Sequence, residues 1–225
     1  MAIIRTSSVI PTTISKAPVP ILADPVELPV LVINERTMTF RMDSRTAWNR
    51  FALGVINYSV STIAETVNTP NVERNLYRNS SLIGDYFTPY YGITAGTKIG
   101  DYLISICKTT IAVVGVIKQK QTDITIFQNT WGQQIGDLAQ YLNSLNPGQY
   151  PVDLLAELLT NLTIFWTKDF IARVNNDFAA DAVALDNVLK VAVTGIPDHA
   201  NQGYSSIADV LSRGIIAQFP LSFIG

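Results

Sequence analysis

The sequence predicts an all-α fold: an up-and-down bundle of about four long helices with shorter helices added, preceded by an extended, proline-rich N-terminal arm. Apolar residues recur at three- and four-residue spacings from Asp43 to the C-terminus, which is the period of amphipathic helices. Five prolines interrupt the first thirty residues. With 48% hydrophobic and 15% charged residues, the 225-residue chain can bury a sizeable core. We therefore expect an arm over residues 1–42 and a helical-bundle domain over residues 43–225.

The arm is predicted from its prolines, which forbid a helix and hold each preceding residue in an extended conformation. Short β-branched runs follow at residues 30–34 and 37–40, with a short hairpin expected across residues 34–36. Because flexible linkers are rich in Gly, Ser or charge and this segment is not, we expect it to lie against an apolar surface. An extended arm can add a strand to the edge of a partner's sheet. The residues predicted to bind a partner in this way are Val30, Leu31, Val32, Ile33, Thr37 and Phe40.

The helices are predicted from apolar spacing and from capping or breaking residues at their ends. Asp43 and Ser44 are N-cap candidates for the first helix, and residues 89–92 form a turn after the second. Because residues 145–151 form a short connection, the helices on either side of it should be antiparallel neighbours. Trp131, Trp166 and Cys107 are expected in the core. The predicted helices span residues 43–68, 71–86, 94–121, 122–145, 151–174, 179–193 and 205–218.

Charge and composition argue against several classes of function. Sixteen basic residues against 18 acidic ones give a net charge of −2, without the basic patch that a nucleic-acid backbone requires. The most apolar internal stretch, residues 111–117, is much shorter than the roughly 18 residues of a membrane-spanning helix. The N-terminus lacks the apolar run of a secretory signal. We expect neither nucleic acid nor a membrane span, and a location in the cytoplasm or in a virion.

Catalytic and metal-binding constellations are not predicted. His199 and Cys107 are the one histidine and the one cysteine, too few for a metal cluster, and His199 is interpreted as part of a turn. Asp177 and Asp181 stand near a helix start, beyond Arg173, so an ion pair is their expected role. We therefore assign no catalytic residue, no metal and no cofactor.

Several segments are, taken together, similar to those of a known family. They are Trp48-Asn49-Arg50, Pro89-Tyr90-Tyr91-Gly92, and residues 131–137, 142–147, 177–181 and 207–220. In this order they resemble a poorly characterised family of helical-bundle proteins, found mainly in bacteria, whose members carry conflicting labels as transferases or kinases. The resemblance covers the chain from about residue 40 to its end. It implies a helical bundle and no particular activity.

The chain departs from that family at its histidines. Members typically carry histidines before the Trp-x-Arg segment, in the third and fifth helices and in the last one. The corresponding segments here contain none: residues 45–47, 107–109, 161–163 and 186–188. Imidazole is the usual divalent-metal ligand and the usual general base near neutral pH. The resemblance therefore implies that any such site of the relatives has been lost, and that residues 194–205 are an added stretch interrupting the family's final helix.

These observations lead to one leading hypothesis and one alternative. The leading hypothesis is a non-enzymatic structural or interaction protein that uses its arm and apolar surface to bind neighbouring protein subunits, of the same or another kind, in a large assembly. A virion component, such as a minor capsid protein, is a specific form of it. The alternative is a small-molecule enzyme or ligand-binding bundle protein of the bacterial type. It requires polar residues to converge on one pocket, namely Asn49, Arg50, Gln133, Asp137 and Lys168.

Overall fold

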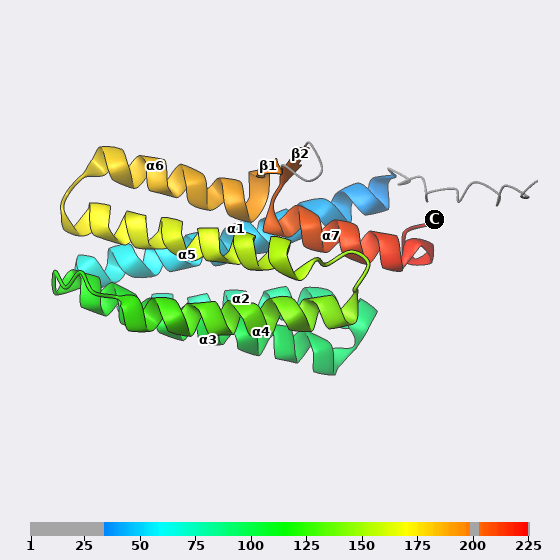
Figure 1. Cartoon of the computed structure of the whole chain (residues 1–225), viewed down its shortest axis with the longest axis horizontal. Coiled ribbons are helices and arrows are strands. Elements are labelled where there is room, and N and C mark those ends of the chain that lie inside the picture. Colours follow the sequence, from blue (N-terminus) through cyan, green and yellow to red (C-terminus); the bar gives the residue numbers. More distant parts are fainter. Residues whose placement is uncertain (1–33, 199–202, 225) are drawn as a thin grey trace, which may run out of the picture. The chain divides into compact units, whose positions relative to one another are not determined.

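The described part of the chain, residues 34–198 and 203–224, forms a helical bundle in the computed structural model (Figure 1). These residues belong to one compact unit. The predicted all-α class is confirmed, with five helices of 21 to 29 residues where about four long ones were expected. The α-helices are α1 (Glu35–Ile63), α2 (Thr69–Tyr91), α3 (Ile93–Lys118), α4 (Thr125–Leu145), α5 (Val152–Val174), α6 (Phe178–Leu189) and α7 (Ile207–Gln218), and a 3-10 helix (Pro220–Phe223) follows α7.

Helix α1 is the central helix of the core, because it packs on α2, α3, α5, α6 and α7. Its Trp48 and Phe51 meet edge to face, and Phe51 meets Trp166 of α5 in the same way. Trp131, Trp166 and Cys107 are all buried, as the sequence predicts. Helices α4 and α5 are antiparallel neighbours (Figure 1), which confirms the expectation from their short connection.

The start of α1 corrects the predicted arm. Helix α1 begins at Glu35 and not at Asp43, because Asn34 is its N-cap. The Asn34 side chain accepts a hydrogen bond from the Thr37 N–H (2.9 Å), and the Thr37 hydroxyl accepts one from the Asn34 N–H (3.0 Å). The hairpin across residues 34–36 and the extended run at 37–40 are therefore wrong, and residues 35–42 belong to the helix. The partner-binding residues expected at 30–33 lie outside the described residues.

The end of α2 also differs from the expectation. The helix continues through Pro89 to Tyr91, where a turn starting at Pro89 was predicted. Proline cannot donate the hydrogen bond to the carbonyl one turn earlier, so the helix lacks one bond at Pro89. It continues for only two residues beyond that point. The break comes instead at Gly92, whose φ of +83° is readily adopted by glycine. Helix α3 therefore follows α2 after a single residue.

The stretch between α6 and α7 contains the two strands of the described chain. Residues Lys190–Thr194 form a π-helix, and Gly195, with a φ of +97°, ends it. Strands β1 (Ile196–Asp198) and β2 (Gly203–Ser205) then pair antiparallel. The predicted sixth helix, 179–193, thus divides at Leu189, and no strand was expected here. His199 lies outside the described residues.

Helix α3 is the one described helix long and apolar enough to cross a membrane by length and composition. It packs against α1, α2, α4 and α5 in the bundle. A core helix passes the same test, so this finding is weak support for a span. The expected lack of a membrane span stays a prediction.

Candidate functional site

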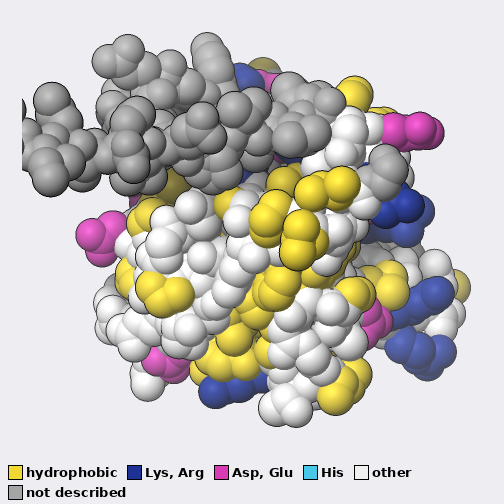
Figure 2. Space-filling view, turned by 90° about the vertical axis from the view of Figure 1, so that its right-hand side faces the viewer, with side chains coloured by type: hydrophobic (Ala, Val, Ile, Leu, Met, Phe, Trp, Pro, Cys, Tyr) yellow, Lys and Arg dark blue, Asp and Glu magenta, His cyan; other side chains and the backbone are white. Residues whose placement is uncertain are grey.

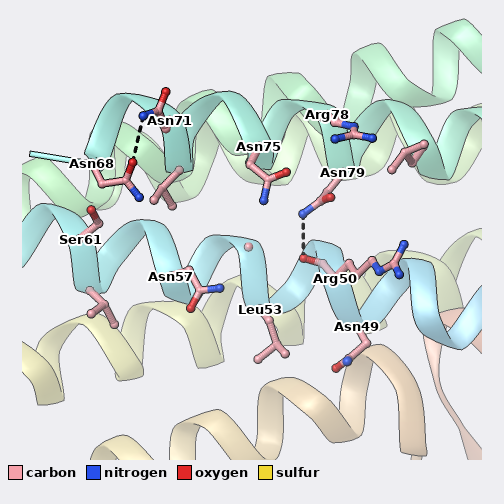
Figure 3. Close-up of a pocket in the computed structure, with 14 residues that line it drawn as sticks. Asn49, Arg50, Leu53, Asn57, Ser61, Asn68, Asn71, Asn75, Arg78 and Asn79 are labelled. Atoms are coloured by element: carbon pink, nitrogen blue, oxygen red, sulfur yellow. Dashed lines mark hydrogen bonds between the residues drawn. The ribbon is translucent and has the colours of Figure 1, made fainter. Parts of the chain in front are cut away.

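A groove of about 860 Å³ lies between α1 and α2. Figure 3 shows α2 along one side of it and α1 along the other, with Asn75 and Asn79 reaching from α2 toward α1. Six asparagines and two arginines line it, and no carboxylate does. The lining residues are Asn49, Arg50, Leu53, Gly54, Asn57, Val60, Ser61, Asn68, Asn71, Val72, Asn75, Arg78, Asn79 and Leu82.

The two helices approach closely at the base of the groove because of Gly54. A Cβ atom there would lie 3.2 Å from the amide nitrogen of Asn79 and 3.4 Å from Leu76 Cδ1. The Asn79 amide donates a hydrogen bond to the Arg50 carbonyl oxygen (3.1 Å), which ties α2 to α1. Leu53, Val72 and this glycine contribute apolar surface to the otherwise polar lining.

Several polar side chains of the groove are available to a ligand. Asn49, Asn57 and Asn75 have no hydrogen-bond partner for their side-chain amides within residues 34–198 and 203–224. The guanidinium groups of Arg50 and Arg78 likewise form no ion pair with that part of the chain. An amide both donates and accepts, and an arginine only donates. The groove can therefore receive a neutral or anionic group that offers hydrogen-bond acceptors and donors.

The structure separates the five residues of the alternative pocket. Asn49 and Arg50 line the α1–α2 groove. Gln133 and Asp137 are exposed on α4. Lys168 stands on α5, where its ammonium lies 5.1 Å from the centre of the Phe165 ring. The expectation that all five converge on one cavity is therefore wrong, because α4 and α5 do not line this groove.

A second candidate surface lies at the end of the bundle where α1 begins and the chain ends. Phe40 stacks on Tyr86 at 4.4 Å, and Tyr90 stacks on Phe223 at 5.8 Å. The Asn34 side chain donates to the Phe223 carbonyl oxygen at 2.7 Å. Thr37 is buried and Phe40 packs in this cluster, so these two side chains serve the chain's own fold, not an inserted strand as expected.

Around this aromatic cluster, large apolar side chains remain exposed. Leu221 and Ile224 are 82% and 62% exposed, and Ile93, two residues after the end of α2, is 66% exposed. Figure 2 looks onto this end of the bundle and shows hydrophobic side chains gathered across its face. We call these three residues the apolar end. An exposed apolar patch of this kind is typical of an interaction site.

Two buried carboxylates have pKa values shifted in opposite directions. Burial raises the pKa of Asp169, and nearby Asp181 adds to the rise, while the Arg173 guanidinium opposes it; the net pKa lies above the ordinary value. Arg173 also pairs with Asp181 at 2.9 Å, which confirms the predicted ion pair, whereas Asp177 caps α6. Burial also raises the pKa of Asp209, but hydrogen bonds from Arg45 and other groups outweigh it and hold the net pKa low.

Metal and thiol chemistry find little support in the described residues. No group of three or more His, Cys, Asp or Glu side chains that could hold a metal ion occurs among residues 34–198 and 203–224. Burial raises the pKa of the Cys107 thiol to about 12, against a smaller opposing effect of the Ser80 hydroxyl. A thiol with that pKa is a poor nucleophile near neutral pH.

Sequence reasoning missed most of the groove. Asn57, Asn75 and Arg78 were not singled out, because neither helix contains the site by itself. The available signal was the recurrence of asparagine on α2, at residues 68, 71, 75 and 79, with spacings of three and four. Those spacings place the four amides on one helix face.

Comparison of the chain with family models, with curated proteins and with solved structures gives no match. The resemblance to the bacterial helical-bundle family therefore stays a prediction.

Proposed function

We propose that this protein is a non-enzymatic structural or interaction protein that binds neighbouring subunits of a large assembly through its N-terminal arm and its apolar end. The observation that carries the proposal is the exposure of Leu221 and Ile224, on either side of Phe223, whose carbonyl accepts a hydrogen bond from the α1 N-cap residue Asn34. Ile93 is a third exposed apolar side chain, at the start of α3. Burying such side chains against a partner removes apolar surface from water, at roughly 25 cal/mol per Å².

The low charge of the chain supports the same proposal. Charged residues make up 15% of the sequence, against the roughly 25% typical of soluble domains. Interface cores are depleted in charge in the same way. A virion component, such as a minor capsid protein, is one specific form of the proposal. The form tested first is self-assembly, in which the neighbouring subunits are copies of the same chain.

The test is the light-scattering mass of the full-length chain and of Leu221→Glu/Ile224→Glu. We expect an oligomer for the unchanged chain and a shift toward the 24.7 kDa monomer for the variant, because two carboxylates would then face the partner. Val67→Glu is the matched control, since Val67 is fully exposed beyond the other end of α1. A monomeric unchanged chain at 100 times the working concentration would overturn self-assembly, and a variant with unchanged mass would overturn the role of the apolar end in it.

A further inference from the structure

The α1–α2 groove has the chemistry of a receptor for an extended peptide. An extended chain offers one N–H donor and one C=O acceptor per residue, and asparagine amides can pair with both. Asn49, Asn57 and Asn75 hold such amides without a hydrogen-bond partner in the described part of the chain. Leu53 and Val72 in the lining offer apolar contacts to side chains of a bound peptide.

The length of the groove sets the length of the peptide. The lining residues on α1 run from Asn49 to Ser61, and the twelve steps between these two residues rise by about 18 Å in an α-helix. An extended chain rises by about 3.3 Å per residue, so five or six residues fill the same distance.

The N-terminal arm carries charges that complement the groove. Arg50 and Arg78 give the groove two positive charges, and no carboxylate lines it. Residues 17–33 contain two carboxylates, Asp24 and Glu27, and no Lys or Arg. Pro25 has no N–H, so this stretch offers more hydrogen-bond acceptors than donors to the amide and guanidinium groups of the groove.

The length of the chain decides which copy supplies the arm. The seven Cα-to-Cα steps from Glu27 to Asn34 span at most about 25 Å when fully extended. Arg50 lies sixteen residues after Asn34, which is about 24 Å along α1. If the arm of the same copy were to reach Arg50, it would have to be fully extended, with no residues left for the turn that leads back into α1. The arm of a neighbouring copy does not need this turn.

We propose that the α1–α2 groove receives the N-terminal arm of a neighbouring copy, with the segment around Asp24 and Glu27 bound as an extended peptide between Arg50 and Arg78. This assignment rests on the proposed function, because it names the receptor for the arm. The apolar end and the groove then act as two separate contact regions of one assembly.

A disulfide cross-link between two copies tests the assignment directly. One full-length copy carries Val26→Cys and the other Asn75→Cys, and the buried Cys107 thiol contributes no background. We expect a disulfide-linked dimer on mild oxidation of the mixture. The matched control pairs Val26→Cys with Asp137→Cys, which is exposed on α4. Equal cross-linking in the two mixtures would overturn the assignment.

Charge reversal provides a second test that does not depend on cysteines. Arg50→Glu/Arg78→Glu should weaken self-association by roughly tenfold or more, and adding Asp24→Arg/Glu27→Arg on the arm should restore most of it. Lys108→Glu/Lys168→Glu makes the same change of charge on exposed residues outside the groove and should leave association unchanged. If the arm substitutions did not restore the self-association lost in Arg50→Glu/Arg78→Glu, a direct contact between the arm and these two arginines would be contradicted.

The two proposals fail in different ways. A full-length chain that stays monomeric refutes self-assembly, and with it both the tested form of the proposed function and the groove assignment. A full-length oligomer that dissociates on Leu221→Glu/Ile224→Glu, but shows neither groove cross-linking nor charge rescue, keeps the proposed function and refutes the groove as the receptor.

Discussion

Replacing Gly96 by alanine should force α2 and α3 apart. A Cβ atom on Gly96 would lie 2.2 Å from the Thr88 hydroxyl oxygen and 2.6 Å from the Gly84 carbonyl oxygen. Ordinary contact begins at 3.4 Å, so the backbone of Gly84 would have to move by about 0.8 Å. Because α2 and α3 are joined by Gly92 alone, the helices cannot separate at this point without losing contacts along their length.

The expected loss of stability follows from two opposing effects. Overpacking a well-packed interior costs about 1–3 kcal/mol, and a clash with backbone belongs at the upper end of that range. Alanine regains about 1 kcal/mol over glycine in a helix interior. The free energy of unfolding should therefore fall by about 2 kcal/mol, which lowers Tm by about 4–8 °C in a chain of this size.

The assay is thermal and urea unfolding followed by circular dichroism at the helical band, with Gly115→Ala as the matched control. Gly115 stands in the same helix, and a Cβ atom there would meet nothing within 4 Å. That variant should gain up to about 1 kcal/mol from helix propensity alone. Both substitutions replace glycine by alanine in α3, so opposite changes in the free energy of unfolding would be due to the contact between α2 and α3 at Gly96.

A Gly96→Ala variant as stable as the unchanged chain would refute the reasoning. So would a shift of both variants in the same direction, because the close approach at Gly84 would then have no energetic effect.

Three further predictions concern buried groups. Asp169→Asn should flatten the pH dependence of stability between about pH 4 and pH 8, because the raised pKa of this carboxyl makes the free energy of unfolding fall as pH rises through that window. Urea midpoints measured across the window check this. An equal change of the midpoint with pH in the variant and the unchanged chain would contradict it. Cys107 should react with a thiol reagent only after unfolding, as its pKa is raised by burial; stoichiometric labelling of the folded chain at pH 8 would be inconsistent with this. Asp209→Ala should lower the free energy of unfolding by about 2 kcal/mol, because Asp209 of α7 accepts hydrogen bonds from Arg41 and Arg45 of α1. Urea unfolding measures the loss. A change under about 0.5 kcal/mol would argue against this role.

Much of the fold follows from local sequence patterns. The apolar period from Trp48 onward predicts the helices, and the short connection at residues 145–151 predicts the antiparallel pair α4 and α5. These features depend on side chains three or four positions apart in the chain. The core positions of Trp131 and Trp166 follow from the same period.

The predicted boundaries failed where a local signal was overridden. The β-branched run at residues 37–40 favours a strand, but Asn34 and Thr37 form a capping box and Phe40 finds an aromatic partner in Tyr86 of α2. Pro89 signals a helix end, yet the helix continues to Tyr91, and the Tyr90 and Tyr91 rings pack on Phe219.

The sequence by itself determined the helical class, the buried side chains and the low charge of this protein, because each depends on composition or on spacing along one helix. Only the tertiary structure decided which polar residues meet. Asn49 and Arg50 of α1 face Asn75 and Arg78 of α2 across one groove, while Gln133 and Asp137 stand apart on α4. The physical reason is that a groove between two helices depends on their packing, here on the contact that Gly54 permits, and no pattern within either helix specifies that contact.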